Sequence, residues 1–528
     1  MRHAVVFACL LASTAVPALA QERPPADAAA PPPRASANTH RDALLADVEA
    51  HWTRPPVDEQ TSVSRGSVTV RGQRIGYTAT AGTLTIRDDQ GRPTASVFYT
   101  AYTRDGAASN RRPVTFFYNG GPGSATVWLH MGSFAPVRVQ TGSPEYIRPA
   151  PYGFGPNPDS LIDVTDMVFI DAIGAGWSRP LGDKTGRDFW GVDQDANAFA
   201  AAIERYTTIN GRWSSPKFLF GESYGTLRNG AVAAILEEDG LSLNGIVYLS
   251  SILNYGVRQP GYDQNYLTLL PSYAATAWYH NRLQNRPEDL DTFLNEVRAF
   301  TSGRYAAALA QGSNLPAGEK QAVAEQMAAY TGLSADYIQR ADLRVDLRNF
   351  QTELMRDRRT VVGRLDSRYT ASPSNANADA PDDDPASTAI TGAFLASFQD
   401  YARRTLGYSS DMPYNISARG EGWRWDWQHT APGARQPQTT PNTALDLAHT
   451  MRTNTHLKVI FLNGYYDMAT PFFGAEFDAS HMLLSEELQR NVEFLYYPSG
   501  HMIYLNPEML TRMRDDLARW YGEALSGS

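Results

Sequence analysis

The sequence Gly221-Glu222-Ser223-Tyr224-Gly225 follows the strand-like run 217–220 and precedes a helix-like segment. A sharp turn from strand to helix holds a serine clear of the sheet, and flanking glycines let neighbouring backbone approach where a Cβ would clash. By itself, a Gly-x-Ser-x-Gly match is a weak signal in a long chain. It predicts a nucleophilic Ser223 only if suitable partners occur elsewhere in the sequence.

Two candidate partners lie in the C-terminal part of the chain. Asp467 follows the apolar run 459–464, and His501 follows the run 492–497. Catalytic groups gather where the strands of an open α/β sheet end. A serine hydroxyl needs an imidazole to take its proton, and the imidazole needs a carboxylate to fix its tautomer. The chain order Ser223, Asp467, His501 resembles that of the α/β-hydrolase fold.

A glycine-rich loop supplies the fourth part of such a site. The sequence Asn119-Gly120-Gly121-Pro122-Gly123-Ser124 follows the strand-like run 114–118. Glycines expose backbone N–H groups to a developing oxyanion, and we expect the amides of Gly121 and Tyr224 to be the donors. A tight Gly-Pro turn without a chemical role is the alternative for an isolated segment. Four pieces in the correct order, each after an apolar run, favour the catalytic interpretation.

With these segments, the chain resembles the serine carboxypeptidases, the family of carboxypeptidase Y and cathepsin A, and more closely their bacterial branch. A glutamate directly before the serine, combined with Asn-Gly-Gly-Pro-Gly, makes the resemblance specific. It implies an α/β-hydrolase fold and removal of C-terminal residues from peptides, best at acidic pH. The matching segments lie between about residues 113 and 505, and they are 119–123, 168–171, 174–178, 221–225, 463–467 and 500–502.

An enzyme that acts at a peptide's C-terminus must recognise a free carboxylate, so it needs neutral donors or a protonated acid beside the scissile bond. The resemblance assigns this role to Asn119 and Glu222, with the Gly120 amide as a third donor. A protonated Glu222 could donate to the carboxylate, whereas an ionised one would repel it. Activity should therefore fall as pH rises through the pKa of this group. The alternative is that Glu222 only braces the turn at Ser223.

The sequence departs from better-known members of the family at three places. They have a tryptophan, a cysteine and a second glutamate where this chain has Phe117, Ser124 and the segment 130–133, which lacks a carboxylate. If His130 occupies the place of that glutamate, a charged imidazole would lower the pKa of Glu222 and remove the acid optimum. A solvent-facing His130 without such a role is the alternative.

The N-terminus resembles a signal peptide. Residues 1–20 have a basic start at Arg2, an apolar middle at 4–12 and Ala18-Leu19-Ala20 at their end. The apolar run is too short to span a bilayer, and no later run is long enough, so no membrane span is expected. The only cysteine, Cys9, would leave with this segment. We expect a disulfide-free protein that is periplasmic or secreted in a Gram-negative bacterium. The 43 arginines against 4 lysines suggest a high-GC bacterial genome.

Several function classes are disfavoured. A formal net charge of -9 argues against nucleic acid as a partner. The histidines lack the spacing of a zinc site, and the loop 120–123 lacks the lysine of a phosphate loop. The acidic run 382–384 lacks the glycine and terminal glutamate of a calcium loop. We therefore expect neither a metal nor a cofactor.

Composition and periodicity divide the chain into segments. The proline- and alanine-rich residues 21–40 are expected to be a disordered lead-in. Residues 41–253 are interpreted as the first part of the α/β core, where an antiparallel meander at 64–118 leads into a mainly parallel sheet with helices on both faces. Helix-like stretches dominate 254–442, which we interpret as an inserted, mostly helical cap. The core then resumes at 443–528.

An aromatic segment near the end of the predicted cap has two interpretations. Trp423, Trp425 and Trp427 alternate with polar residues and are expected to share one face of a strand. Packing in the core is the favoured interpretation. A wall of the substrate cleft is the alternative.

We interpret the chain as a serine carboxypeptidase that acts on peptides with a free C-terminus. Ser223 would be the nucleophile, His501 the general base and then acid, and Asp467 the group that orients His501. An esterase or acyltransferase on the same scaffold is the first alternative, because the same three residues serve any acyl transfer. A non-catalytic binding protein is the second, and the intact triad argues against it. No oligomeric state follows from the sequence.

Overall fold

The computed structural model describes residues 55, 57–108, 110–259, 261–418 and 423–526. The described residues belong to one compact unit. The predicted signal peptide and lead-in lie outside the described residues. In the described part, no helix is both long enough and apolar enough to cross a bilayer.

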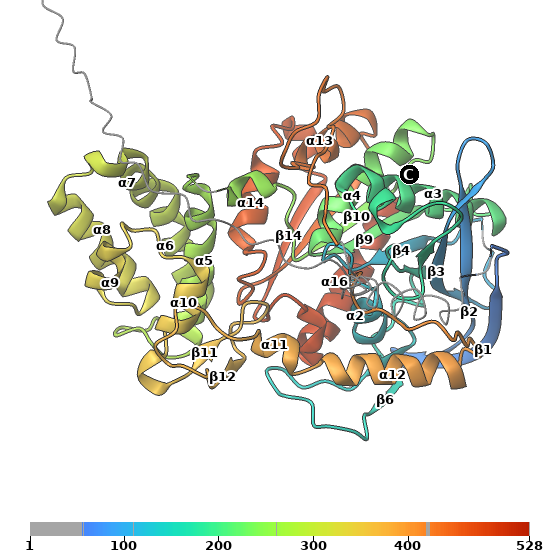
Figure 1. Ribbon diagram of the computed structural model, residues 1–528, viewed down its shortest axis with the longest axis horizontal. Coiled ribbons are helices and arrows are strands. Elements are labelled where there is room, and N and C mark those ends of the chain that lie inside the picture. Colours follow the sequence, from blue (N-terminus) through green and yellow to red (C-terminus); the bar gives the residue numbers. More distant parts are fainter. Residues whose placement is uncertain (1–54, 56, 109, 260, 419–422, 527–528) are drawn as a thin grey trace, which may run out of the picture. The chain divides into compact units, whose positions relative to one another are not determined.

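A ten-stranded sheet runs through the described part of the chain in the order β1-β2-β3-β7-β4-β9-β10-β13-β14, with β8 paired to β3 (Figure 1). The first three strands are an antiparallel meander, and every neighbouring pair from β7 to β14 is parallel. The predicted meander and mainly parallel sheet are confirmed. The strand bounds are β1 Thr61–Val70, β2 Gln73–Arg87, β3 Pro93–Arg104, β4 Val114–Tyr118, β7 Asp166–Ile170, β8 Arg179–Pro180, β9 Lys217–Glu222, β10 Gly245–Leu249, β13 Lys458–Gly464 and β14 Val492–Tyr497.

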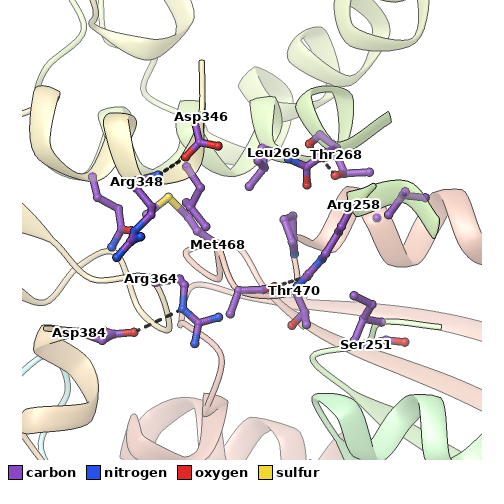
Figure 2. Close-up of a pocket in the computed structure, with 18 of the residues that line it drawn as sticks. Ser251, Arg258, Thr268, Leu269, Asp346, Arg348, Arg364, Asp384, Met468 and Thr470 are labelled. Atoms are coloured by element: carbon purple, nitrogen blue, oxygen red, sulfur yellow. Dashed lines mark hydrogen bonds and ion pairs between the residues drawn. The ribbon is translucent and has the colours of Figure 1, made fainter. Parts of the chain in front are cut away.

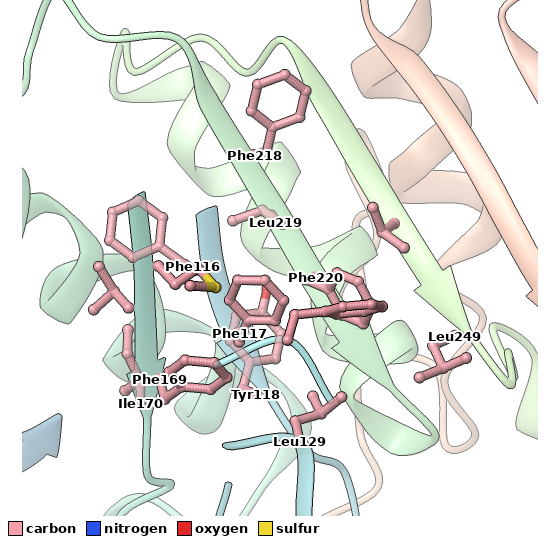
Figure 3. Close-up of a cluster of buried hydrophobic side chains, with 14 of the residues drawn as sticks. Phe116, Phe117, Tyr118, Leu129, Phe169, Ile170, Phe218, Leu219, Phe220 and Leu249 are labelled. Carbon is pink, nitrogen blue, oxygen red and sulfur yellow. The ribbon is translucent and has the colours of Figure 1, made fainter. Parts of the chain in front are cut away.

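Aromatic side chains fix the centre of the sheet. Phe117 on β4 stacks between Phe169 on β7, at a ring-centroid distance of 4.8 Å, and Phe220 on β9, at 4.7 Å (Figure 3). All three side chains are buried. Because parallel neighbours end at the same edge of a sheet, this packing sets the glycine-rich loop after β4 beside the turn that follows β9.

Helices cover both faces of the sheet, as predicted. Successive side chains of a strand point to opposite faces of the sheet, so the neighbours Thr115 and Phe116 contact helices on opposite faces. Phe116 contacts Tyr206 of α3 (Val192–Ile209) at 5.7 Å between ring centroids. Thr115 Oγ1 bonds with the hydroxyl of Tyr521 on α16 (Pro507–Ser526) at 2.8 Å. The helices α4 (Tyr224–Glu238) and α13 (Ala444–Thr453) pack on the same face of the sheet as α3. The short helix α2 is Val127–Gly132.

The described part of the segment predicted as a cap divides among three hydrophobic clusters. Its first six helices form a cluster of their own with Tyr465, Met468 and Phe472, and in Figure 1 they lie together in yellow and green. Their bounds are α5 Gln264–Tyr279, α6 Leu290–Phe300, α7 Ala306–Gln311, α8 Ala317–Thr331, α9 Ala335–Arg340 and α10 Leu347–Glu353. By contrast, Phe398 of α12 (Thr391–Arg404) belongs to the main core.

The remaining elements are short. The pair β5 and β6 is antiparallel, as is the pair β11 and β12 inside the predicted cap. Both pairs lie outside the central sheet. Their bounds, with those of the short helices, are β5 Val137–Val139, β6 Phe154–Pro156, β11 Val361–Val362, β12 Thr370–Ala371, α11 Pro385–Thr388, α14 Phe472–Ser480 and α15 Glu486–Gln489.

Candidate active site

Ser223 lies at the turn between β9 and α4, as predicted. Its backbone has φ 61° and ψ -130°, a conformation that is strained for a residue with a side chain. A Cβ on Gly221 would lie 2.2 Å from Gly225 O, so the turn closes only because this position is a glycine. Ser223 remains half-buried between buried neighbours. The tight turn therefore leaves the Ser223 side chain partly accessible to solvent.

Asp467 and His501 are brought together by the ends of β13 and β14. His501 Nδ1 and Asp467 Oδ2 are 2.7 Å apart, and both side chains are buried. Thr470 Oγ1 donates to the same Asp467 oxygen at 2.7 Å, and it lies 3.1 Å from His501 Nδ1. Burial disfavours the charged imidazole, but Asp467 outweighs burial and raises the pKa of His501. The carboxylate is thus placed to stabilise an imidazolium.

The end of β10 links the histidine loop to the serine turn. Ser250 Oγ donates to His501 O at 2.6 Å, and the backbone N–H of Ser223 donates to Leu249 O at 3.0 Å. Within the described residues, the Ser223 hydroxyl has no hydrogen-bond partner. Catalytic hydrogen bonds are often long without substrate and shorten when it binds.

The two predicted oxyanion donors lie on adjoining backbone segments. A Cβ on Gly120 would lie 2.3 Å from Tyr224 N, so the glycine-rich loop touches the serine turn directly. Among the described residues, the amides of Gly121 and Tyr224 have no hydrogen-bond acceptor. Free amides on both sides of a nucleophile are the arrangement that stabilises a developing oxyanion.

Glu222 is held in a buried network beside Ser223. Its Oε2 accepts from Asn119 Nδ2 at 2.8 Å and from the Tyr504 hydroxyl at 2.9 Å. Asn119 is itself oriented, because its Oδ1 accepts from Leu129 N at 2.9 Å. Burial raises the pKa of Glu222 to about 7, although His501 and these two donors act in the opposite direction. Glu222 is therefore uncharged in acidic solution.

Neither interpretation of His130 is correct. Its side chain is buried, stacks on Phe169 at 4.6 Å between ring centroids, and bonds through Nε2 to the Tyr102 hydroxyl at 2.7 Å. Burial lowers the pKa of His130 to about 3, so the imidazole is neutral and cannot act on Glu222 as a charge. Tyr504, which the sequence reasoning did not single out, contacts Glu222 instead.

A buried ion pair links the helix that follows Ser223 to a neighbouring helix. Arg228 on α4 donates to Asp195 on α3 through Nε at 2.7 Å, and through Nη1 to Asn119 O at 2.8 Å. Its guanidinium lies 4.0 Å from the ring centroid of Phe199. The sequence reasoning missed this residue, which lies five residues after Ser223 on the predicted helix. Arg228 ties α3, α4 and the glycine-rich loop together.

The three tryptophans pack near the serine turn and line a cavity, whereas their role in a substrate cleft stays a prediction. They share one side of an extended segment, but the predicted strand is reduced to a single bridge between Gly191 and Asp426. Trp425 is buried against Tyr224, with ring centroids 5.3 Å apart. Trp423, Trp425 and Trp427 also line an open cavity of about 960 Å³ that reaches Gly121. The segment is thus packed on the serine turn and forms a wall beside it.

The parallel sheet, the serine turn and the buried acid–histidine pair define a protein of the α/β-hydrolase class. A family model described as serine carboxypeptidase matches residues 72–495, and the chain belongs to this family. In the described residues, no group of three or more His, Cys, Asp or Glu side chains could hold a metal ion. No protein with a curated description matches the chain.

The solved structures that match this chain have low sequence identity to it. Proline iminopeptidase from Mycobacterium smegmatis is 14% identical, with 84% of this chain and 99% of that chain covered and a TM-score of 0.35. A soluble variant of monoglyceride lipase from Saccharomyces cerevisiae is 10% identical, with coverages of 84% and 94% and a TM-score of 0.35. Juvenile hormone epoxide hydrolase from Bombyx mori is 12% identical, with coverages of 85% and 79% and a TM-score of 0.33.

Proposed function

We propose that the protein is a serine-type carboxypeptidase that releases C-terminal residues from peptides. The observation that carries this proposal is the buried Glu222, whose carboxyl group lies next to Ser223 and has a pKa of about 7. A neutral carboxyl group beside a nucleophile can donate a hydrogen bond to a carboxylate. A hydrolase of esters or amides without a terminal carboxylate has no need of such a group.

The substrate carboxylate would bind on the glycine-rich side of Ser223. Protonated Glu222, the second N–H of Asn119 Nδ2 and the Gly120 amide would donate to it. Asn119 is fixed by its bond to Leu129 N, so little side-chain freedom is lost on binding. The signal peptide expected at 1–20 supports periplasmic or secreted action on such peptides.

In the chemical step, Ser223 Oγ attacks the carbonyl carbon of the last peptide bond while His501 Nε2 takes its proton. The amides of Gly121 and Tyr224 stabilise the oxyanion. His501 then protonates the leaving nitrogen, which departs as a free amino acid and leaves an acyl-enzyme. Water deprotonated by His501 attacks this ester, and the proton returns to Ser223. Asp467 holds the imidazole tautomer through both steps.

The test compares three substrates that share one acyl group: a blocked dipeptide with a free C-terminus, its C-terminal amide and an aryl ester. We expect kcat/KM for the free acid to exceed that for the amide by at least about tenfold, the effect of one charge-assisted contact. The Ser223→Ala variant is the control and should abolish turnover of all three substrates.

Two results would overturn the proposal. Equal turnover of the free acid and the amide, together with fast ester hydrolysis, would identify an esterase or acyltransferase. Absence of any Ser223-dependent turnover, in protein that circular dichroism shows to be folded, would favour a binding protein.

A further inference from the structure

A second cavity, of about 520 Å³, lies beside the Asp467–His501 pair. Thr470, which bonds to Asp467 and lies 3.1 Å from His501 Nδ1, is one of its lining residues (Figure 2). Ser251 and Met468 also line it, and they follow the carboxyl ends of β10 and β13. The cavity therefore shares a wall with the candidate active site.

The sheet order sets the side of Ser223 on which this cavity lies. Asn119 follows β4, which neighbours β9 on one side, whereas β10 and β13 lie on the other side. A peptide with its terminal carboxylate at Asn119 has its scissile bond at Ser223. The acyl part of the peptide must then extend away from β4. The cavity beyond β10 lies in that direction.

Arg258 brings a positive charge to the cavity. It is the last residue of a short helical turn, Tyr255–Arg258, and its side chain is accessible to solvent. The guanidinium donates from Nη2 to Ala469 O and lies 5.4 Å from the ring centroid of Tyr255. In the described part of the chain, Arg258 forms no ion pair. Four of its five N–H groups thus remain available.

Arg364 adds a second positive charge to the same cavity. Its Nε is 4.0 Å from Asp384 Oδ2, a long contact, and 46% of its side chain is exposed. Desolvation lowers the pKa of Arg258 and the charge of Arg364 lowers it further, whereas Asp467 and Asp478 act in the opposite direction. Two guanidinium groups repel each other, and an anion bound between them offsets this repulsion.

Four of the five carboxylates that line the cavity accept hydrogen bonds from backbone N–H groups. Asp384 Oδ2 accepts from Leu365 N at 3.0 Å, and Asp478 Oδ2 accepts from Leu253 N at 3.1 Å. Burial raises the pKa of Asp478 to about 7, so its charge is reduced near neutral pH. On the rim, Asp346 accepts from Arg348 N and Asp382 from Ser374 N, while Asp383 is exposed. None of these groups forms an ion pair with Arg258.

We propose that Arg258 and Arg364 bind the carboxylate side chain of an aspartate or glutamate in the acyl part of the substrate. This inference rests on the proposed function and names its substrate class: peptides with an acidic residue on the N-terminal side of the scissile bond. The guanidinium fork matches a carboxylate in geometry, and a charge-assisted pair in a cavity is stronger than one on an open surface.

The test uses two blocked dipeptides that differ by one group, with glutamate or glutamine before a C-terminal phenylalanine. We expect kcat/KM to be about tenfold higher for the glutamate peptide, and the preference to decrease as salt is raised. Arg258→Gln and Arg364→Gln should each remove most of this preference, because each lowers kcat/KM for the glutamate peptide more than kcat/KM for the glutamine peptide. Arg340→Gln, at an exposed arginine outside the cavity, is the matched control and should keep the preference.

Binding measured by calorimetry on the Ser223→Ala variant separates the two proposals. Tighter binding of the glutamate peptide without turnover by the parent enzyme would support the arginine site and overturn the carboxypeptidase. Turnover with equal kcat/KM for both peptides would support the carboxypeptidase and overturn the arginine site. A preference that survives in both Arg258→Gln and Arg364→Gln would also overturn it. Because Arg258 contacts the loop of Asp467, Arg364→Gln keeps the test valid if the first variant loses activity.

Discussion

The Tyr504 hydroxyl donates a hydrogen bond of 2.9 Å to Glu222 Oε2, the same oxygen that accepts from Asn119 at 2.8 Å. Both donors favour the ionised carboxylate, whereas burial favours the neutral acid. Burial prevails, and the pKa of Glu222 is about 7. The network therefore fixes the position of the carboxyl group without forcing it to ionise.

The first prediction concerns pH. Below about 7, Glu222 is protonated and can donate to a substrate carboxylate, and above this value its charge repels that carboxylate. We expect kcat/KM for a free-acid dipeptide to fall as pH rises through about 7. It also falls on the acid side as His501 becomes protonated, and because the pKa of His501 is raised from 6.5, the two limbs lie close together and the pH optimum is narrow. The Glu222→Gln variant keeps a donor that does not titrate, so its fall above pH 7 should disappear.

The peptide amide is the control for this profile. It carries no terminal charge, so the ionisation of Glu222 should change its hydrolysis far less. Identical profiles for acid and amide would contradict a carboxylate-binding role of Glu222.

The second prediction tests Tyr504. In Tyr504→Phe, a donor to the Glu222 carboxylate is lost, so the pKa of Glu222 should rise further. The high-pH limb of the kcat/KM profile should therefore move to higher pH, and the maximum of kcat/KM should fall only a few-fold, by about 1 kcal/mol for one hydrogen bond. An unshifted limb, or a shift to lower pH, would show that Tyr504 does not act through Glu222.

The sequence predicted the parts of the site that depend on local signals. The turn at Ser223 and the loop at Asn119 each follow an apolar run and contain glycines, which limits the backbone to a few conformations. Asp467 and His501 follow the last two strands of a parallel sheet, and such strand ends meet at one edge. Local sequence pattern and sheet topology together were therefore sufficient to predict where these residues lie in the fold.

Contacts between distant segments were not predictable in this way. Tyr504 lies in the apolar stretch 502–505, which is typical of core packing, and nothing in the sequence aims its hydroxyl at Glu222. The burial of His130 was not predictable for the same reason, because a single histidine in the sequence does not indicate whether its side chain is buried. The helices of 254–442 were recognisable in the sequence. Periodicity does not indicate, however, that Phe398 of this segment packs in the main core, or that Phe472, which follows the segment, packs against its first six helices.

The third prediction concerns Thr470 as a positioning residue. Its hydroxyl donates to Asp467 Oδ2 at 2.7 Å, the oxygen that also contacts His501. Thr470→Val keeps the shape and removes the donor, so we expect kcat to fall about tenfold with little change in KM, the effect of about one hydrogen bond. Thr470→Ser should restore most of the activity. An equal loss in the serine variant would show that packing of the methyl group, and not the hydroxyl, is what matters.

The fourth prediction concerns stability. His429 is buried between two carboxylates, with Nδ1 2.5 Å from Asp193 Oδ1 and Nε2 2.9 Å from Asp446 Oδ2. Burial opposes its charge, but the two carboxylates prevail and raise the pKa of His429 from 6.5 to about 9. A raised pKa in the folded state stabilises the protein fully below pH 6.5, and the contribution is lost as pH rises through 9.

The variant His429→Gln should therefore reduce the free energy of unfolding most at pH 6, by up to about 3 kcal/mol, and much less at pH 9.5. Urea unfolding of the variant and the parent at several pH values measures this difference, in which the other titrating groups cancel. His456→Gln, at an exposed histidine, is the matched control and should show no such trend. A destabilisation by His429→Gln that stays constant between pH 6 and 9.5 would mean that His429 acts by packing and neutral hydrogen bonds, not as a cation that joins α3 to α13.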